Sequence, residues 1–317
     1  MSELFHVSSA PHVRAKDSTS RVMFYVILAM IPTTLFGIYN FGFRALLLII
    51  ATVASCVASE TVFNKIVGKK NTINDLSAVV TGMILALNLP VNLPVWEAIL
   101  GGAFAIIVVK CLFGGLGQNF MNPALGARCF LLIAFASDMT NFVTDTYTTA
   151  TPLALIRNNG GVIPYDLDTM DMLLGFTGGT IGETCVIALL IGAMILVITG
   201  TIDLKIPGAY IITFAIYMFL FGTSAFDFTY VVAQLCGGGL MFGAFFMATD
   251  YVTSPITPKG KILFGICCGI LTGIFRTIGA NAEGVSFAII ISNLLVPLIE
   301  KITIPNAFGV VKVKEGK

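Results

Sequence analysis

The sequence predicts an all-α integral membrane protein with ten transmembrane helices in two inverted five-helix repeats. Hydrophobic residues make up 56% of the 317 residues and charged residues only 11%, whereas a soluble domain carries about 25% charged residues. Ten mostly apolar stretches approach the length of about 20 residues that a hydrocarbon core requires. The two halves of the chain also resemble each other at a spacing of about 162 residues.

These ten stretches divide the chain into five regions. Spans are expected near 22–39, 45–63, 76–90, 96–114, 120–136, 184–201, 206–222, 229–248, 262–276 and 284–299. Several are short or rich in Gly and Pro, which is tolerated where protein or a cavity satisfies the backbone. The expected regions are an N-terminal segment 1–21, a repeat 22–136, a loop 137–183, a repeat 184–299 and a tail 300–317.

Basic residues predict the orientation of the spans. With the N-terminus in the cytoplasm, all but four of the 18 Lys and Arg residues fall on the inner face, as the positive-inside rule favours. The four exceptions are Arg44, Arg128, Arg157 and Arg276. Both termini are therefore expected in the cytoplasm, with the acidic loop 137–183 on the opposite side of the membrane.

Two pairs of short segments indicate the internal repeat. Leu116–Asn119 matches Ile278–Asn281, and Asn88–Pro94 corresponds to Thr249–Pro258. Five helices in each half is an odd number, so the second half enters the membrane upside down. Inverted repeats of this kind place their central site at the repeat interface, framed by broken helices.

The usual enzyme and metal-binding motifs are absent from the sequence. It holds no P-loop, no GxSxG, no HExxH and no CxxC pair, and a net charge of +1 gives no nucleic-acid footprint. His6 and His12 both precede the first span, and the seven cysteines lie almost entirely in apolar stretches. We therefore predict no catalytic side chain and no metal site, and we interpret Gly237–Gly239 as a helix-packing element.

Ionisable residues at membrane depth need a reason to be there. Glu60, Lys110 and Arg276 lie near the ends of spans, where we expect them to extend to the interface. Arg128 and Asp250 are stronger candidates because each lies beside a break in a span. An arginine there could hold a phosphate or the carbonyls of a redox ring, and an aspartate could receive a cation.

A threonine-rich segment, Asp145–Leu153, interrupts the long outer loop. Taken by its chemistry alone, it is a polar turn with several hydroxyls, and an ordinary loop has the same composition. Pro152 restricts Thr151 to extended backbone geometry. We expect this geometry to present the Thr151 side chain outward.

With this segment included, the chain resembles a known family over nearly its whole length. It is similar to the D subunit of the Rnf electron-transport complex and to the B subunit of the Na⁺-pumping NADH:quinone oxidoreductase. The residues that carry the resemblance are Ser9–His12, Gln118–Ala124 and Ala150–Leu153. The short polar stretch before the first span favours the Rnf branch.

The resemblance implies a covalent flavin on Thr151. In that family the threonine of the motif carries FMN through a phosphodiester bond, and a separate flavin transferase installs it from FAD. This sequence has Thr148 and Thr149 where the family more commonly has Ser-Gly, so these two threonines are rival acceptors. The attachment at the phosphate leaves the flavin ring free for electron transfer.

The resemblance also implies a second, non-covalent flavin (riboflavin or FMN) in this protein. We expect it at the repeat interface, near Asn119, Asn122 and Arg128. The implied function is electron transfer within an ion-translocating ferredoxin:NAD⁺ oxidoreductase that exports Na⁺ or H⁺. The chain is not catalytically complete alone, and its implied partners are membrane lipid, a second FMN subunit, iron–sulfur subunits and an NAD-binding subunit.

Two other functions stay open from the sequence. The inverted repeat also fits a self-contained transporter or channel of urea-transporter-like fold without a redox role, and a scaffold whose partners hold all the cofactors is the third option. A yellow, redox-active preparation favours the electron-transfer function. The coupling ion stays open as well, since Asp250, Thr253 and Asn281 carry oxygens that suit Na⁺.

Overall fold

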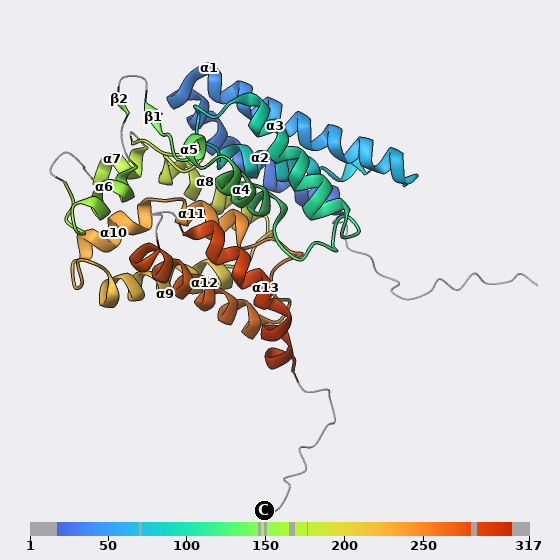
Figure 1. The fold of residues 1–317 in the computed structure, drawn as a ribbon. Coiled ribbons are helices and arrows are strands. Elements are labelled where there is room, and N and C mark those ends of the chain that lie inside the picture. The colour runs from blue at the N-terminus through green and yellow to red at the C-terminus, as the bar shows by residue number, and fades with distance from the viewer. Residues whose placement is uncertain are drawn as a thin grey trace, which may run out of the picture.

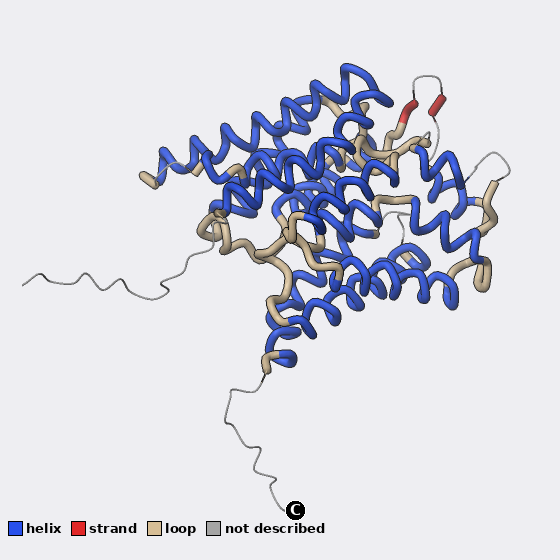
Figure 2. Tube along the Cα trace, turned by 180° about the vertical axis from the view of Figure 1, so that it is seen from behind, coloured by secondary structure: helices blue, strands red, loops and turns tan. Residues whose placement is uncertain are grey.

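The computed structural model is a bundle of helices (Figure 1). It describes residues 18–305 except 70–71, 145–146, 149–150, 165–168, 176 and 280–283. Within these residues the only strands are β1 (Val143–Thr144) and β2 (Tyr147–Thr148), a small antiparallel pair (Figure 2). Apart from this pair, the fold is helical as predicted. The expectations for His6, His12, Thr149, Asn281 and residues 306–317 lie outside the described residues.

Helix α1 (Thr19–Val67) covers the first two expected spans. Ser18 caps its start by accepting the N–H of Arg21, which satisfies one of the free donors of the first turn. Gly42 interrupts it with φ 70° and ψ −158°, a backbone conformation that favours glycine. The break falls between the expected spans 22–39 and 45–63, so the two arms of α1 correspond to them.

Four shorter helical segments complete the first half. They are α2 (Ser77–Leu87), α3 (Val95–Phe104), the π-helix η2 (Ala105–Cys111), which continues α3, and α4 (Pro123–Ala134), with short turns at η1 (Ile73–Asp75) and α5 (Ala136–Met139). Helix α4 begins where it does because Asn122 accepts the N–H of Ala124 and Pro123 occupies the first helical position.

The described residues of the expected outer loop 137–183 include short helices and strands. It holds β1, β2, α6 (Pro152–Asn158) and α7 (Thr169–Leu174). Figure 1 shows these elements grouped at one end of the bundle. The candidate threonine therefore lies on a folded cap rather than on an open loop.

The second half of the chain is also helical. Its elements are α8 (Val186–Ile198), α9 (Lys205–Phe221), α10 (Phe228–Cys236), α11 (Leu240–Phe242), the π-helix η3 (Gly243–Met247), α12 (Pro258–Ile278) and α13 (Val285–Thr303). Helix α10 and the α11–η3 segment meet at a 63° bend. This broken helix occupies the expected span 229–248.

Helices of the first and second halves of the chain pack on each other. Helix α1 packs on α8, and α4 packs on α13. At Gly192 of α8 an added Cβ would overlap the carbonyl of Ala29 in α1, so a small residue is required at this crossing. The core between the halves contains Ala29, Met30, Leu189 and Ile289, each at most 1% exposed.

In the part of the chain that the structure describes, three helices are long and apolar enough on their own to cross a membrane: α1, α12 and α13. The bent α10–α11–η3 pair makes a fourth if it is counted as one span. Helices α2, α4, α8 and α9 are apolar but shorter. Helical segments occur in all ten expected ranges, and these lengths and compositions are typical of a multi-pass membrane protein with broken and short helices.

Candidate functional site

Thr151 is the N-cap residue of α6. Its backbone is extended (φ −56°, ψ 151°), as the following proline predicts. Its hydroxyl accepts the N–H of Ala154 at 3.4 Å. The prediction that the side chain points outward is wrong, because Thr151 is only 8% exposed. The cap hydrogen bond and the packing of α6 against the bundle turn it inward instead.

Thr151 borders a small pocket, which we call the Thr151 pocket. Its empty volume is about 320 Å³. Four pieces of chain form it, namely the start of α6, Met172 of α7, the segment 177–184 and the end of α10 with the glycines that follow. Glycines 178, 179, 237 and 238 contribute to its walls, so backbone rather than bulky side chains faces the threonine. A hydroxyl beside a glycine-lined hollow is suited to carrying a group that needs room close to its attachment point.

The glycine run Gly237–Gly239 breaks the second-half helix instead of packing it. Gly238 and Gly239 have φ of 64° and 66°, a left-handed conformation in which side chains cost about 1–2 kcal/mol. The interpretation of this run as a helix-packing element is therefore wrong. The break leaves carbonyl groups at the end of α10 without helical partners, and Arg276 donates to those of Gly237 and Gly238 at 3.0 and 3.2 Å.

Arg128 lies at the interface of the two halves, where it forms a buried ion pair. Its guanidinium donates to Glu183 at 3.2 Å, to Asn88 at 2.9 Å and to Ser286 at 3.0 Å. Arg128 and Glu183 are 4% and 7% exposed. Glu183 also lines the Thr151 pocket, so this network reaches the floor of that pocket.

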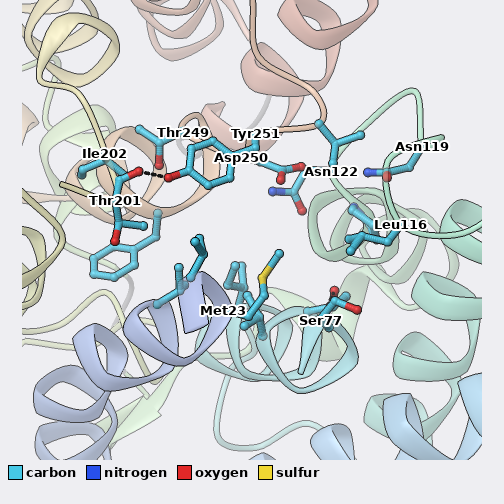
Figure 3. Close-up of a pocket in the computed structure, with 18 of the residues that line it drawn as sticks. Met23, Ser77, Leu116, Asn119, Asn122, Thr201, Ile202, Thr249, Asp250 and Tyr251 are labelled. Carbon is cyan, nitrogen blue, oxygen red and sulfur yellow. Dashed lines mark hydrogen bonds between the residues drawn. The ribbon is translucent and has the colours of Figure 1, made fainter. Parts of the chain in front are cut away.

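A larger pocket lies between the halves, and we call it the Asn122 pocket. The space between its lining residues, counted out to the open mouth, is about 770 Å³. Figure 3 shows Asn119, Asn122 and Asp250 on the wall opposite Met23 and Ser77. Most of the remaining lining is apolar and comes from both halves of the chain.

Asn122 joins the halves at this pocket. Its amide nitrogen donates to the carbonyl of Met247 at 3.3 Å, while its amide oxygen caps α4. Asn119 and Asn122 are thus brought together as expected, but Arg128 is not among the residues that line this pocket. On the Asp250 side, the hydroxyl of Thr253 donates to the carboxyl at 3.1 Å.

Glu60 and Lys110 form a second buried ion pair, at 3.0 Å. The ammonium of Lys110 also donates to Ser77 at 2.6 Å, and Thr72 donates to Glu60 at 2.6 Å. Glu60, Lys110 and Arg276 are 3%, 2% and 7% exposed. The prediction that these three extend to the membrane interface is therefore wrong, because partners distant in the sequence hold them inside the protein.

Sequence reasoning misses one residue of these sites and undervalues another. Glu183 is, by sequence, only one of several acidic residues of the outer loop, yet it lies directly before α8 and pairs with Arg128. Asp250 is predicted only as a cation ligand, and the structure adds it to the wall of the Asn122 pocket. The repeat offered a signal for Asp250, because its counterpart about 162 residues earlier is the buried Asn88.

Comparison with known proteins gives a consistent result. A family model described as the NQR2, RnfD, RnfE family matches residues 6–309. The chain is 46% identical to the D subunit of the Na⁺-translocating ferredoxin:NAD⁺ oxidoreductase complex of Acetobacterium woodii, covering 98% of this chain and 96% of that one. It is 39% identical to the D subunit of the proton-translocating ferredoxin:NAD⁺ oxidoreductase complex of Clostridium ljungdahlii, covering 96% of each. It is also 35% identical to the D subunit of an ion-translocating oxidoreductase complex of Methanosarcina acetivorans, covering 96% of this chain and 97% of that one.

Proposed function

The chain belongs to the NQR2, RnfD, RnfE family, and on that premise we propose that it is the membrane subunit of an ion-translocating ferredoxin:NAD⁺ oxidoreductase. The observation that carries this proposal is the match, over nearly the full length, to relatives named as the D subunit of that complex. Such a protein works only with the other subunits of the complex, which are its partners. The two relatives are named for different ions, so Na⁺ and H⁺ are both candidates for the exported ion.

The proposed topology has ten spans in two inverted five-helix repeats, with both termini in the cytoplasm. Three features support it. Helical segments occur in all ten expected ranges, helices α4 and α13 begin about 162 residues apart and pack on each other, and the basic residues favour this orientation. The Thr151 pocket then faces the extracytoplasmic side and the Asn122 pocket the cytoplasm.

The proposed attachment site of a covalent FMN is Thr151. The site fits such a group, because the hydroxyl borders a hollow whose walls are partly glycine backbone. In the transfer from FAD, the Thr151 oxygen forms a bond to the FMN phosphorus, and AMP leaves as the phosphorus–oxygen bond to it breaks. The hydroxyl proton passes to a base of the transferase. The bound flavin supplies one-electron and two-electron transfer.

The Asn122 pocket is the proposed site of the second flavin, riboflavin or FMN. Its mostly apolar walls suit a flat aromatic ring. The amides of Asn119 and Asn122 are placed to hydrogen-bond with a polar edge, and the side chains of Lys110 and Asp250 also line the pocket. Arg128 acts elsewhere in this proposal, as the partner of Glu183 between the two pockets.

The test is the intact mass of the chain, purified within its complex after co-expression with a flavin transferase. The wild-type chain is expected to carry an FMN-sized increment, which Thr151→Ala loses and Thr151→Ser keeps because serine retains the hydroxyl. Acid precipitation separates the attached flavin from any flavin held without a bond. The releasable flavin is expected to persist in Thr151→Ala, since that variant leaves the Asn122 pocket intact.

Three outcomes would contradict the proposal. An unmodified wild-type chain, with the transferase shown active on another substrate, excludes Thr151 as the acceptor. A colourless complex with neither attached nor releasable flavin favours the alternative of a transporter or channel without redox function. An increment that persists in Thr151→Ala points to the rival acceptors Thr148 and Thr149.

A further inference from the structure

The helix break beneath the Thr151 pocket is held by one side chain from another helix. Arg276 of α12 is 7% exposed. Its guanidinium donates to the carbonyls of Gln234, Gly237 and Gly238 and to the side-chain oxygen of Gln234. Its positive end also lies 4.9 Å from the centre of the Phe214 ring. One residue therefore engages the carbonyl-rich end of α10 from several directions.

The chemistry of arginine suits this position. The last carbonyls of a helix have no partners within it, and inside a membrane protein each unsatisfied group costs several kcal/mol. A guanidinium offers five N–H donors in a fixed planar fork, so it can bridge carbonyls that diverge. An ammonium is a compact point charge that cannot span them in one plane.

The position of the break is transmitted to Thr151 through Leu153. A Cβ added at Gly237 would lie 3.0 Å from Leu153, and one added at Gly238 would overlap both Leu153 and Arg276. Leu153 is only 2% exposed, so the glycine backbone is the seat on which the first turn of α6 rests. Pro152 links that seat stiffly to Thr151.

We propose that Arg276 is a positioning residue for the Thr151 site. It acts by holding the Gly237–Gly239 break in the shape on which α6 is seated, and it touches neither the acceptor oxygen nor the flavin. This inference rests on the proposed flavin attachment at Thr151. It assigns the membrane-buried charge a task on the extracytoplasmic cap, not in ion transport.

Two variants test the proposal in the whole complex, co-expressed with the flavin transferase. In Arg276→Ala the rate of flavin attachment is expected to fall roughly tenfold or more, because a misplacement of about 1 Å suffices for such losses. Arg276→Lys keeps the positive charge but loses the planar fork of N–H donors. Its rate of flavin attachment is expected to lie between those of the wild type and Arg276→Ala. Free guanidinium added to Arg276→Ala is expected to restore part of the rate.

A second readout does not depend on the flavin. Cys236 lines the Thr151 pocket directly before the break, so its alkylation by a charged maleimide, resolved by peptide mass, reports the shape of the break. Alkylation is expected to be faster in Arg276→Ala and to slow again with guanidinium. Tyr210→Phe is the matched control, because it removes a buried hydrogen bond to Thr272 on the same helix without touching the break.

The outcomes separate this inference from the proposed function. Wild-type attachment and wild-type Cys236 alkylation in the Arg276 variants overturn the positioning role. Equal effects from Tyr210→Phe also overturn it, since they indicate general loosening of the bundle. If Arg276→Ala does not assemble, Arg276→Lys decides by the same two readouts. A wild-type chain without flavin contradicts the attachment at Thr151. The alkylation of Cys236 still tests whether Arg276 holds the Gly237–Gly239 break.

Discussion

Each half of the molecule buries a basic residue near the end of its fourth expected span, but the two are held in different ways. Lys110 in the first half pairs with the Glu60 carboxylate and donates to the Ser77 hydroxyl at the start of α2. Arg276 in the second half binds backbone carbonyls at the break before α11. Side chains with a carboxylate and a hydroxyl therefore satisfy Lys110, whereas backbone carbonyls of a broken helix satisfy Arg276.

The difference shows that a buried basic residue can be satisfied by an acidic side chain or by the backbone of a broken helix. In the first half, helix α2 begins at Ser77 without a break, and Ser77 and Lys110 both line the Asn122 pocket. In the second half, the helix is broken between α10 and α11. The glycines at this break leave carbonyl groups that accept from Arg276. The opened backbone also creates the seat for Leu153. The helix break in the second half therefore forms part of the wall of the Thr151 pocket.

The largest loss of stability is expected when the buried ion pair of the first half is disrupted. Lys110→Met leaves the Glu60 carboxylate buried without its cation, and loss of one member of a buried pair costs about 3–5 kcal/mol. Thermal unfolding of the purified complex in detergent measures this loss. The double variant Lys110→Met/Glu60→Gln removes both charges and is expected to recover most of it. A single variant as stable as the wild type would show that the pair is dispensable.

A smaller loss of stability is expected for a substitution among the second-half glycines that contact Leu153. Gly238→Ala introduces a side chain at φ 64°, which costs about 1–2 kcal/mol, and its Cβ also overlaps Leu153. Gly68→Ala is the matched control, because Gly68 has φ 73° with open space around it. Unfolding and flavin attachment are measured for both. Attachment is expected to fall only in Gly238→Ala, and an equal fall in both variants would remove the role of the seat.

The smallest effect is expected for an exposed pair, which gives the comparison its reference. Asp203 accepts from Lys261 at 3.0 Å and from Lys205 at 3.5 Å, and these bonds lower the pKa of its carboxyl. A lowered pKa stabilises the fold above the unfolded value, about pH 4, and the gain is lost as the pH falls through the folded value.

The corresponding variant is Asp203→Asn. It is expected to lower stability by less than about 1 kcal/mol at neutral pH, because solvent screens an exposed pair. The difference in melting temperature from the wild type is expected to shrink as the pH falls below about 4, where the carboxyl becomes protonated. High salt is expected to shrink it as well. A difference as large as that of Lys110→Met would contradict the distinction between buried and exposed pairs.

The sequence predicted backbone features better than partnerships. The extended backbone of Thr151 followed from Pro152 because the restriction acts between neighbouring residues. The partners of the buried charges did not follow, since Lys110 and Glu60 are 50 residues apart and Arg128 and Glu183 are 55 apart. The prediction for the glycine run is wrong for a related reason. Glycine suits both close helix packing and a helix break, and only the position of Arg276 decides between them.

The Asn122 pocket draws its walls from both halves, so any ligand it holds is bound by both at once. A ligand that binds only the folded chain stabilises it by about 2.7 kcal/mol at a concentration 100 times its dissociation constant. The pocket thereby couples the supply of that ligand to the association of the two halves. Removing such a ligand would lower the free energy of unfolding by that amount, so the stability of the folded chain would depend on the ligand concentration.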